Sequence, residues 1–252
     1  MQHWELLLFF GLIAFVYASV GFGGASSYLA LLAVYQLPVY EMKLTALLCN
    51  IIVVTGGSLL FIMKKQVNFK RILPLVALSV PAAYLGSLMK LDDDTFFIVL
   101  GTSLIVSALL MIFEKKGLDD AGAGERSVVK SGVMGAGIGF LSGMVGIGGG
   151  IFLSPLLHLS RWDVPKKIAA TASVFILVNS ISGLLAHFQK PVTGPVDYWR
   201  IAGLGVAVFA GGQIGSRLGI MKFPPLVIRR VTAVLVFAAG VQVLQNHLHL
   251  HW

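Results

Sequence analysis

SVGFGGASSYLALL, residues 19–32, returns in altered form as MVGIGGGIFLSPLL, residues 144–157. In each stretch a glycine-rich turn separates two apolar runs. Further matches follow in the same order, because the Thr-Ala pair at Thr45 returns at Thr171 and LGS at 85–87 returns as IGS at 214–216. Matches that keep their order along the chain indicate an internal repeat.

We infer from this repeat that the chain consists of two homologous halves. The first covers residues 1–117 and the second residues 126–252, and a polar linker at 118–125 joins them. Each half contains a pair of short apolar segments that flank the glycine turn, followed by three longer apolar segments. The longer ones reach the roughly 18 to 20 residues that a helix needs to cross a bilayer.

The composition places these segments in a membrane. Hydrophobic residues make up 57% of the 252 residues, charged residues only 12%, and the mean hydropathy is +0.87. The apolar runs lack the alternation of a transmembrane β-barrel, so the expected fold is an all-α polytopic membrane protein. The net charge of +8 is typical of basic cytoplasmic loops, and we expect no nucleic-acid partner.

The basic residues predict how each short pair lies in the membrane. If each short pair returns to the side from which it starts, 15 Lys and Arg residues lie on one side of the membrane and four on the other, namely Lys43, Lys90, Lys190 and Arg200. If each short pair crosses the membrane once, 10 Lys and Arg residues lie on one side and 9 on the other. Cytoplasmic loops are enriched in Lys and Arg, so the sequence favours two re-entrant pairs. Both termini are then outside, the linker is cytoplasmic, and five segments per half invert the second half relative to the first.

Inverted repeats with interrupted helices are typical of secondary transporters, whose substrate site lies near the midplane between the repeats. The two glycine turns therefore enter from opposite faces and are predicted to converge on one site. A helix begins after each turn, and its free amides and positive dipole end favour an anion. The candidate residues at the turns are Gly21, Gly23, Gly24, Ala25, Ser26 and Ser27 in the first half, and Gly146, Gly148, Gly149 and Gly150 in the second.

Polar residues inside the longer segments are further candidates, because hydroxyl and amide groups can donate to an anion without burying a formal charge. Interhelical hydrogen bonds are the alternative role for each of them, and for the glycines it is tight helix packing. Gln213 lies in a row of small residues, a pattern that primarily indicates a surface where one helix packs against another. These candidates are Thr45, Asn50, Thr171, Ser173, Asn179 and Gln213.

The quoted turns, each followed by a helix with a Thr-Ala pair, and the later GGQIGSRL at 211–218 resemble the sulfite exporter TauE/SafE family, also called the toluene-sulfonate uptake permease family. The resemblance covers nearly the whole chain. It implies a bacterial inner-membrane protein that transports anionic sulfur compounds such as sulfite, sulfoacetate or other organosulfonates.

The charge distribution suggests a direction. No Asp or Glu lies in the middle of an apolar segment, so a proton relay of embedded carboxylates is not predicted. A negative interior favours outward movement of an anion, and we expect export by alternating access, with an anion channel or a carrier of another small oxyanion or carboxylate as the alternative. Neither a catalytic set nor a metal or cofactor site is predicted. Coupling to a proton and assembly into a homodimer are left open.

Overall fold

A computed structural model of the chain describes residues 4–19, 21–113, 127–160 and 162–222, with short helical pieces between 233 and 245. All regular structure in these ranges is helical, which confirms the predicted all-α fold. The predicted linker at 118–125 lies outside the described residues. The helices are α1 (Glu5–Ser19), α2 (Ala25–Val34), α3 (Val39–Met63), α4 (Phe69–Leu88), α5 (Asp93–Phe113), α6 (Val128–Val145), α7 (Gly150–Leu159), α8 (Pro165–His187) and α9 (Tyr198–Lys222).

Six of these helices, α3, α4, α5, α6, α8 and α9, are long and apolar enough to cross a membrane. Helices α1, α2 and α7 are apolar but shorter. The sequence placed α6 among the short segments. It is longer than expected because Ser127 caps its first turn, where the serine side chain accepts a hydrogen bond from the Lys130 amide.

Helices α3 and α8 form the centre of the molecule and run antiparallel. Asn50 of α3 contacts Ser180 of α8, whereas Ser58, further along α3, contacts Ser173, which lies earlier in α8. These two helices occupy corresponding places in the two halves of the sequence. Corresponding helices that run in opposite directions are what an inverted repeat requires.

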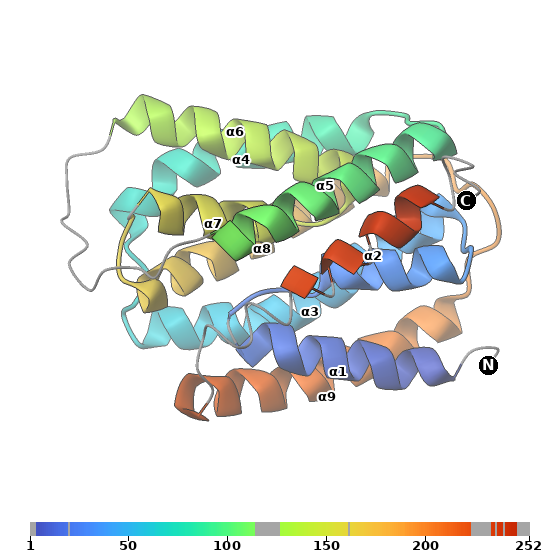
Figure 1. Cartoon of the computed structure of the whole chain (residues 1–252), viewed down its shortest axis with the longest axis horizontal. Helices are drawn as coiled ribbons and strands as arrows, with labels where there is room; N and C mark the ends of the chain where they lie inside the picture. The colour runs from blue at the N-terminus through green and yellow to red at the C-terminus, as the bar shows by residue number, and fades with distance from the viewer. Residues whose placement is uncertain are drawn as a thin grey trace.

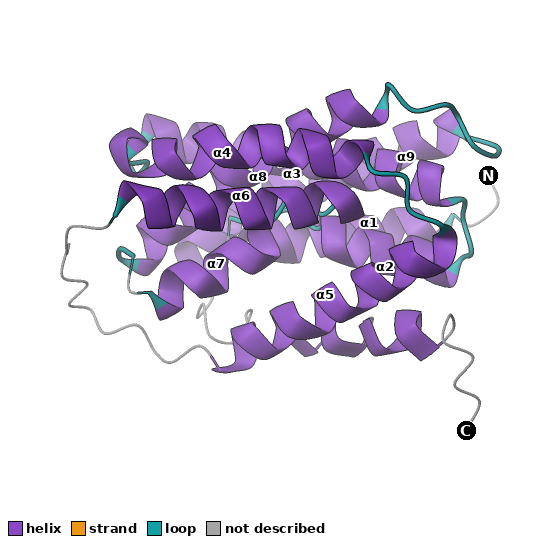
Figure 2. Cartoon of the chain, turned by 90° about the horizontal axis from the view of Figure 1, so that it is seen from above, coloured by secondary structure: helices purple, strands orange, loops and turns teal. Residues whose placement is uncertain are grey.

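Each half also packs its own first helix against the other half. Helix α1 lies along α9 and α6 lies along α4, as Figures 1 and 2 show. A Cβ atom on Gly215 would overlap the Phe15 carbonyl, and one on Gly86 would overlap the Phe140 carbonyl. Phe15 corresponds to Phe140 and Gly86 to Gly215 in the predicted repeat, so the two close contacts occupy equivalent positions of that repeat.

The helix pairs around the turns lie at opposite ends of the molecule. Helix α2 is at the right of Figure 1, beside the start of α1, whereas α7 is at the left, beside the start of α6. Arg71, near the start of α4, donates to the Trp162 carbonyl that follows α7. Each pair thus returns to the end of the bundle from which it starts.

Candidate anion site at the glycine turns

The second turn has a backbone that requires glycine. Gly146 ends α6 in the left-handed region, and Gly146, Gly148 and Gly149 have φ angles of +88°, +78° and +83°. Side chains disfavour this region. The turn therefore depends on its glycines for conformation, and α7 starts directly after it at Gly150.

The first turn uses its glycines differently. Only Gly21 has a positive φ, of +81°, and Gly24, the residue before α2, has a φ of −97°. Gly23 and Gly24 are instead needed for close approach, because a Cβ atom on Gly23 would overlap Asn50 and one on Gly24 would lie 2.5 Å from the ring of Tyr28.

Asn50 lies between the two turns. Its amide nitrogen Nδ2 donates to Ser180 Oγ at 2.8 Å and to the Ile147 carbonyl of the second turn at 3.4 Å. A Cβ atom on Gly23 would overlap Asn50 Oδ1, and one on Gly148 would lie 2.5 Å from Nδ2. The turns of the two halves thus contact opposite atoms of one buried amide, near the middle of α3.

The orientation of this amide follows from its neighbours. A carbonyl oxygen only accepts hydrogen bonds, so the atom that faces Ile147 must be the nitrogen. The oxygen then points toward Gly23 and is buried with no hydrogen-bond partner among the described residues. Buried polar atoms are rarely left without a partner, and the Asn179 Oδ1 atom is in the same state, so this oxygen marks Asn50 as a candidate and not by itself as a ligand site.

The surroundings of the two turns match across the repeat. Gly23 faces Asn50 and Val54, and Gly148 faces Ile176 and Ser180, which are the equivalent positions at an offset of 126 residues. Each half supplies one polar and one apolar residue. The hydrogen bond between Asn50 and Ser180 therefore joins the polar contributions of the two halves.

The helices that follow the turns start without side-chain caps. Neither Gly24 before α2 nor Gly149 before α7 carries a capping side chain, so no N-cap side chain occupies the first amides of either helix. Of the hydroxyls predicted near α2, Ser27 Oγ lies 2.7 Å from the Tyr17 hydroxyl. Ser26 is buried beside it.

The other predicted polar residues do not join Asn50 at the turns. Ser173 contacts Ser58 at 2.9 Å, two helical turns along α3 from Asn50. Asn179 donates to the Phe175 carbonyl of its own helix, and a Cβ atom on Gly56 would lie 2.6 Å from the Gln213 side chain, at the contact of α3 with α9. Thr45 and Thr171 are buried in α3 and α8.

Lys43 is a polar residue near the turns that the sequence analysis counted only as one of four basic residues opposite the basic face. Helix α3 begins at Val39, directly after Pro38, and includes Lys43 in its first turns. The side chain is 5% exposed. Its Nζ donates to the Met144 carbonyl at 2.6 Å and lies 4.5 Å from the centre of the Phe96 ring. The signal in the sequence was a lone lysine at the edge of an apolar run.

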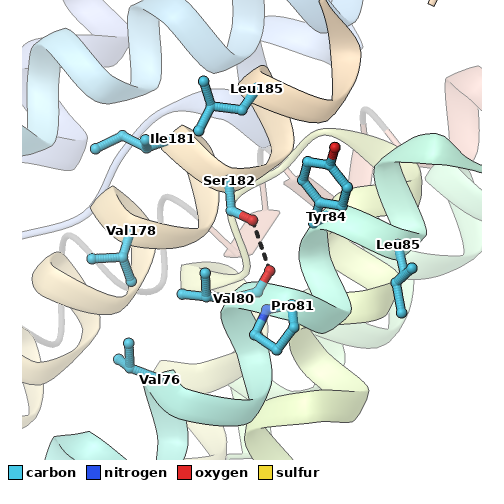
Figure 3. A pocket seen from close by; sticks show the side chains of 9 residues that line it. All are labelled: Val76, Val80, Pro81, Tyr84, Leu85, Val178, Ile181, Ser182 and Leu185. Carbon is cyan, nitrogen blue, oxygen red and sulfur yellow. Dashed lines mark hydrogen bonds between the residues drawn. The ribbon is translucent and has the colours of Figure 1, made fainter. Parts of the chain in front are cut away.

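A groove between α4 and α8 is a poor site for an anion. It has a volume of about 700 Å³, and Figure 3 shows aliphatic side chains around it. The Ser182 hydroxyl already donates to the Val80 carbonyl at 2.7 Å. The lining residues are Val76, Val80, Pro81, Tyr84, Leu85, Val178, Ile181, Ser182 and Leu185.

Comparisons with known proteins extend over nearly the whole chain. A family model described as sulfite exporter TauE/SafE matches residues 6–243. A probable membrane transporter protein of Sinorhizobium fredii is 33% identical over 244 residues, which cover 95% of this chain and 97% of the relative. A probable membrane transporter protein of Bacillus subtilis is 25% identical over 219 residues, 79% of each chain. No solved structure matches the chain.

Proposed function

We propose that the chain, which belongs to the sulfite exporter TauE/SafE family, exports a small sulfur-containing anion through the site where its two glycine turns meet. The family match confirms the resemblance seen in the sequence and makes the chain a multi-pass membrane transporter. The proposed substrates are sulfite, sulfoacetate or another organosulfonate.

The observation that carries this proposal is the contact of both turns with Asn50. The uncapped starts of α2 and α7 direct amide donors and positive dipole ends toward the turns, which suits the oxygens of an anion. Asn50 Nδ2 spends its two N–H groups on Ile147 and Ser180, and the bond that Ser180 Oγ accepts directs the Ser180 hydroxyl hydrogen away from Asn50, as a donor that carries no formal charge. Asn50 Oδ1 is an acceptor without a partner among the described residues, so it suits an anion with a donor of its own, such as hydrogensulfite.

The arrangement of the halves supports alternating access. The turns enter from opposite ends of the molecule and meet near its middle, so a movement of one half against the other would expose the site to each side in turn. An interior-negative potential of 100 mV favours outward movement of one negative charge by about 2.3 kcal/mol. Export therefore needs no coupled proton, whereas uptake would need a coupled cation.

We further propose which end of the helix bundle faces the cytoplasm when the chain lies in a bacterial inner membrane. Arg71, Lys167 and Asp163 lie together at one end of the bundle, and this end, with the linker 118–125, is proposed to be cytoplasmic by the positive-inside rule. Both termini are then outside. The repeat is proposed to comprise residues 1–117 and 126–252.

Transport by the purified chain tests the proposal. Liposomes that contain the protein are loaded with sulfite, a negative interior is imposed with a potassium gradient and valinomycin, and the sulfite that leaves is measured. We expect faster efflux than from protein-free liposomes, and slower release of acetate and sulfate. Equal rates with and without protein would contradict sulfite export. Efflux that needs an imposed proton gradient would show that transport is coupled.

A further inference from the structure

We propose that Lys43 is the cation that pairs with the transported anion as it passes between the central site and one face of the membrane. This inference rests on the proposed function. It adds a specificity-determining charge to a site that otherwise consists of neutral groups.

The position of Lys43 relative to the site is the first support. Lys43 and Asn50 are seven residues apart in α3, which places them on one face of the helix and about 10 Å apart along its axis. Both face the second turn, because Lys43 lies 3.3 Å from a Cβ built on Gly146 and Asn50 lies beside Gly148. An anion that leaves Asn50 along this face meets the Lys43 ammonium next.

The second support is that the Lys43 charge has no carboxylate partner. In the described part of the chain Lys43 forms no ion pair, and its Nζ is held only by the Met144 carbonyl and the Phe96 ring. Glu41, two residues earlier in the chain, is paired with Arg200 instead. Asp93 and Lys190 act on the Lys43 charge electrostatically, but neither forms an ion pair with it. A buried ammonium that lacks an ion pair is costly, and basic residues in membrane segments often mark an ion pathway.

The repeat provides the third support. Lys43 corresponds to Ala169 at the offset of 126 residues, and Ala169 lies 3.3 Å from a Cβ built on Gly21 just as Lys43 lies beside Gly146. At the first turn the small side chain of Ala169 fills the place that Lys43 fills at the second. The presence of a lysine at one turn gives the pathway a cation on one side of Asn50 only.

The contacts of Lys43 are ones that the side chain can exchange for contacts with an anion. Nζ can give up the Met144 carbonyl for an anionic oxygen, because an ammonium has three donors and a charged acceptor makes a stronger bond than a neutral one. Phe96 would continue to hold the lysine stem through the exchange.

Sulfite efflux from liposomes tests the inference with Lys43→Gln and Lys43→Arg. Gln keeps a donor for the Met144 carbonyl without the charge, whereas Arg keeps the charge. We expect Lys43→Gln to raise KM by about tenfold or more, the effect of losing one charge-assisted hydrogen bond, and Lys43→Arg to stay within about threefold of the original chain. An unchanged KM in Lys43→Gln would overturn the inference.

A structural role would give a different pattern. If Lys43 only caps α6, Lys43→Gln lowers the melting temperature of the ligand-free protein without a change in KM, and this result also counts against the inference. If Lys43→Gln does not fold, Lys43→Met takes its place, because it keeps the packing against Phe96.

A measurement on the unaltered chain completes the test. Methanesulfonate and dimethyl sulfone have similar shapes, but only the first is charged. We expect methanesulfonate to inhibit sulfite efflux more strongly, by about tenfold, and equal inhibition would show that no cation pairs with the substrate. If the unaltered chain moves no sulfite at all, the proposed function fails, which is distinct from transport that is indifferent to Lys43.

Discussion

Gly23 and Asn50 fit together so closely that a single methyl group tests their contact. We expect Gly23→Ala to displace the Asn50 side chain, because the new Cβ would overlap Oδ1, and to slow sulfite efflux by about tenfold or more at a stability cost of about 1–3 kcal/mol. Gly183→Ala is the matched control, since its Cβ would make only ordinary contacts with Leu47 at 3.7 and 3.8 Å. Equal efflux by the two variants would show that the contact has no part in transport.

For single residues, the sequence predicted which residue types lie around the turns but not which of them contact the turns. The glycines of both turns and Asn50 were candidates from the sequence. Asn50 and Asn179 look alike as polar residues in apolar helices, yet Asn50 faces the turns and Asn179 bonds to its own helix at Phe175. Which face of a helix meets a turn depends on contacts between distant segments, and no local pattern records it.

The contact of α4 with α6 depends on glycines that let two backbones meet. A Cβ atom on Gly139 would overlap the Ser79 carbonyl, whereas one on Gly137, on the same helix, would meet nothing within 4 Å. We therefore expect Gly139→Ala to lower the free energy of unfolding by about 1–3 kcal/mol and Gly137→Ala to leave it nearly unchanged. Thermal unfolding in detergent measures both, and similar melting temperatures for the two variants would argue against this packing.

The extents of the elements were largely predictable, because apolar runs and glycine breaks mark helices directly. The exceptions are instructive. Helix α3 begins at Val39, directly after Pro38, so it includes the charged residues Glu41 and Lys43 that precede the apolar run. Lys43 is therefore buried inside the helix, near the candidate site, which composition alone did not indicate.

Across the whole molecule, the antiparallel helices α3 and α8 predict that their carboxyl ends face opposite sides of the membrane. We expect a membrane-impermeant maleimide to label Thr193→Cys in intact cells, and to label Lys64→Cys only after permeabilisation. Both residues are exposed, and the natural Cys49 is buried. Cys49→Ala serves as the background for both variants. Labelling of both sites from the same side would contradict the proposed orientation of the repeats.

The central claim is that Asn50 and the two turns bind the transported anion, and calorimetric titration of sulfite into the purified protein tests it most directly. Asn50→Leu removes the hydrogen bonds of the side-chain amide to Ser180 and Ile147. Ser58→Ala removes a buried hydroxyl eight residues further along the same helix. We predict that Asn50→Leu weakens sulfite binding by about tenfold or more while Ser58→Ala binds as the original chain does. Unchanged binding in Asn50→Leu would place the anion elsewhere in the molecule.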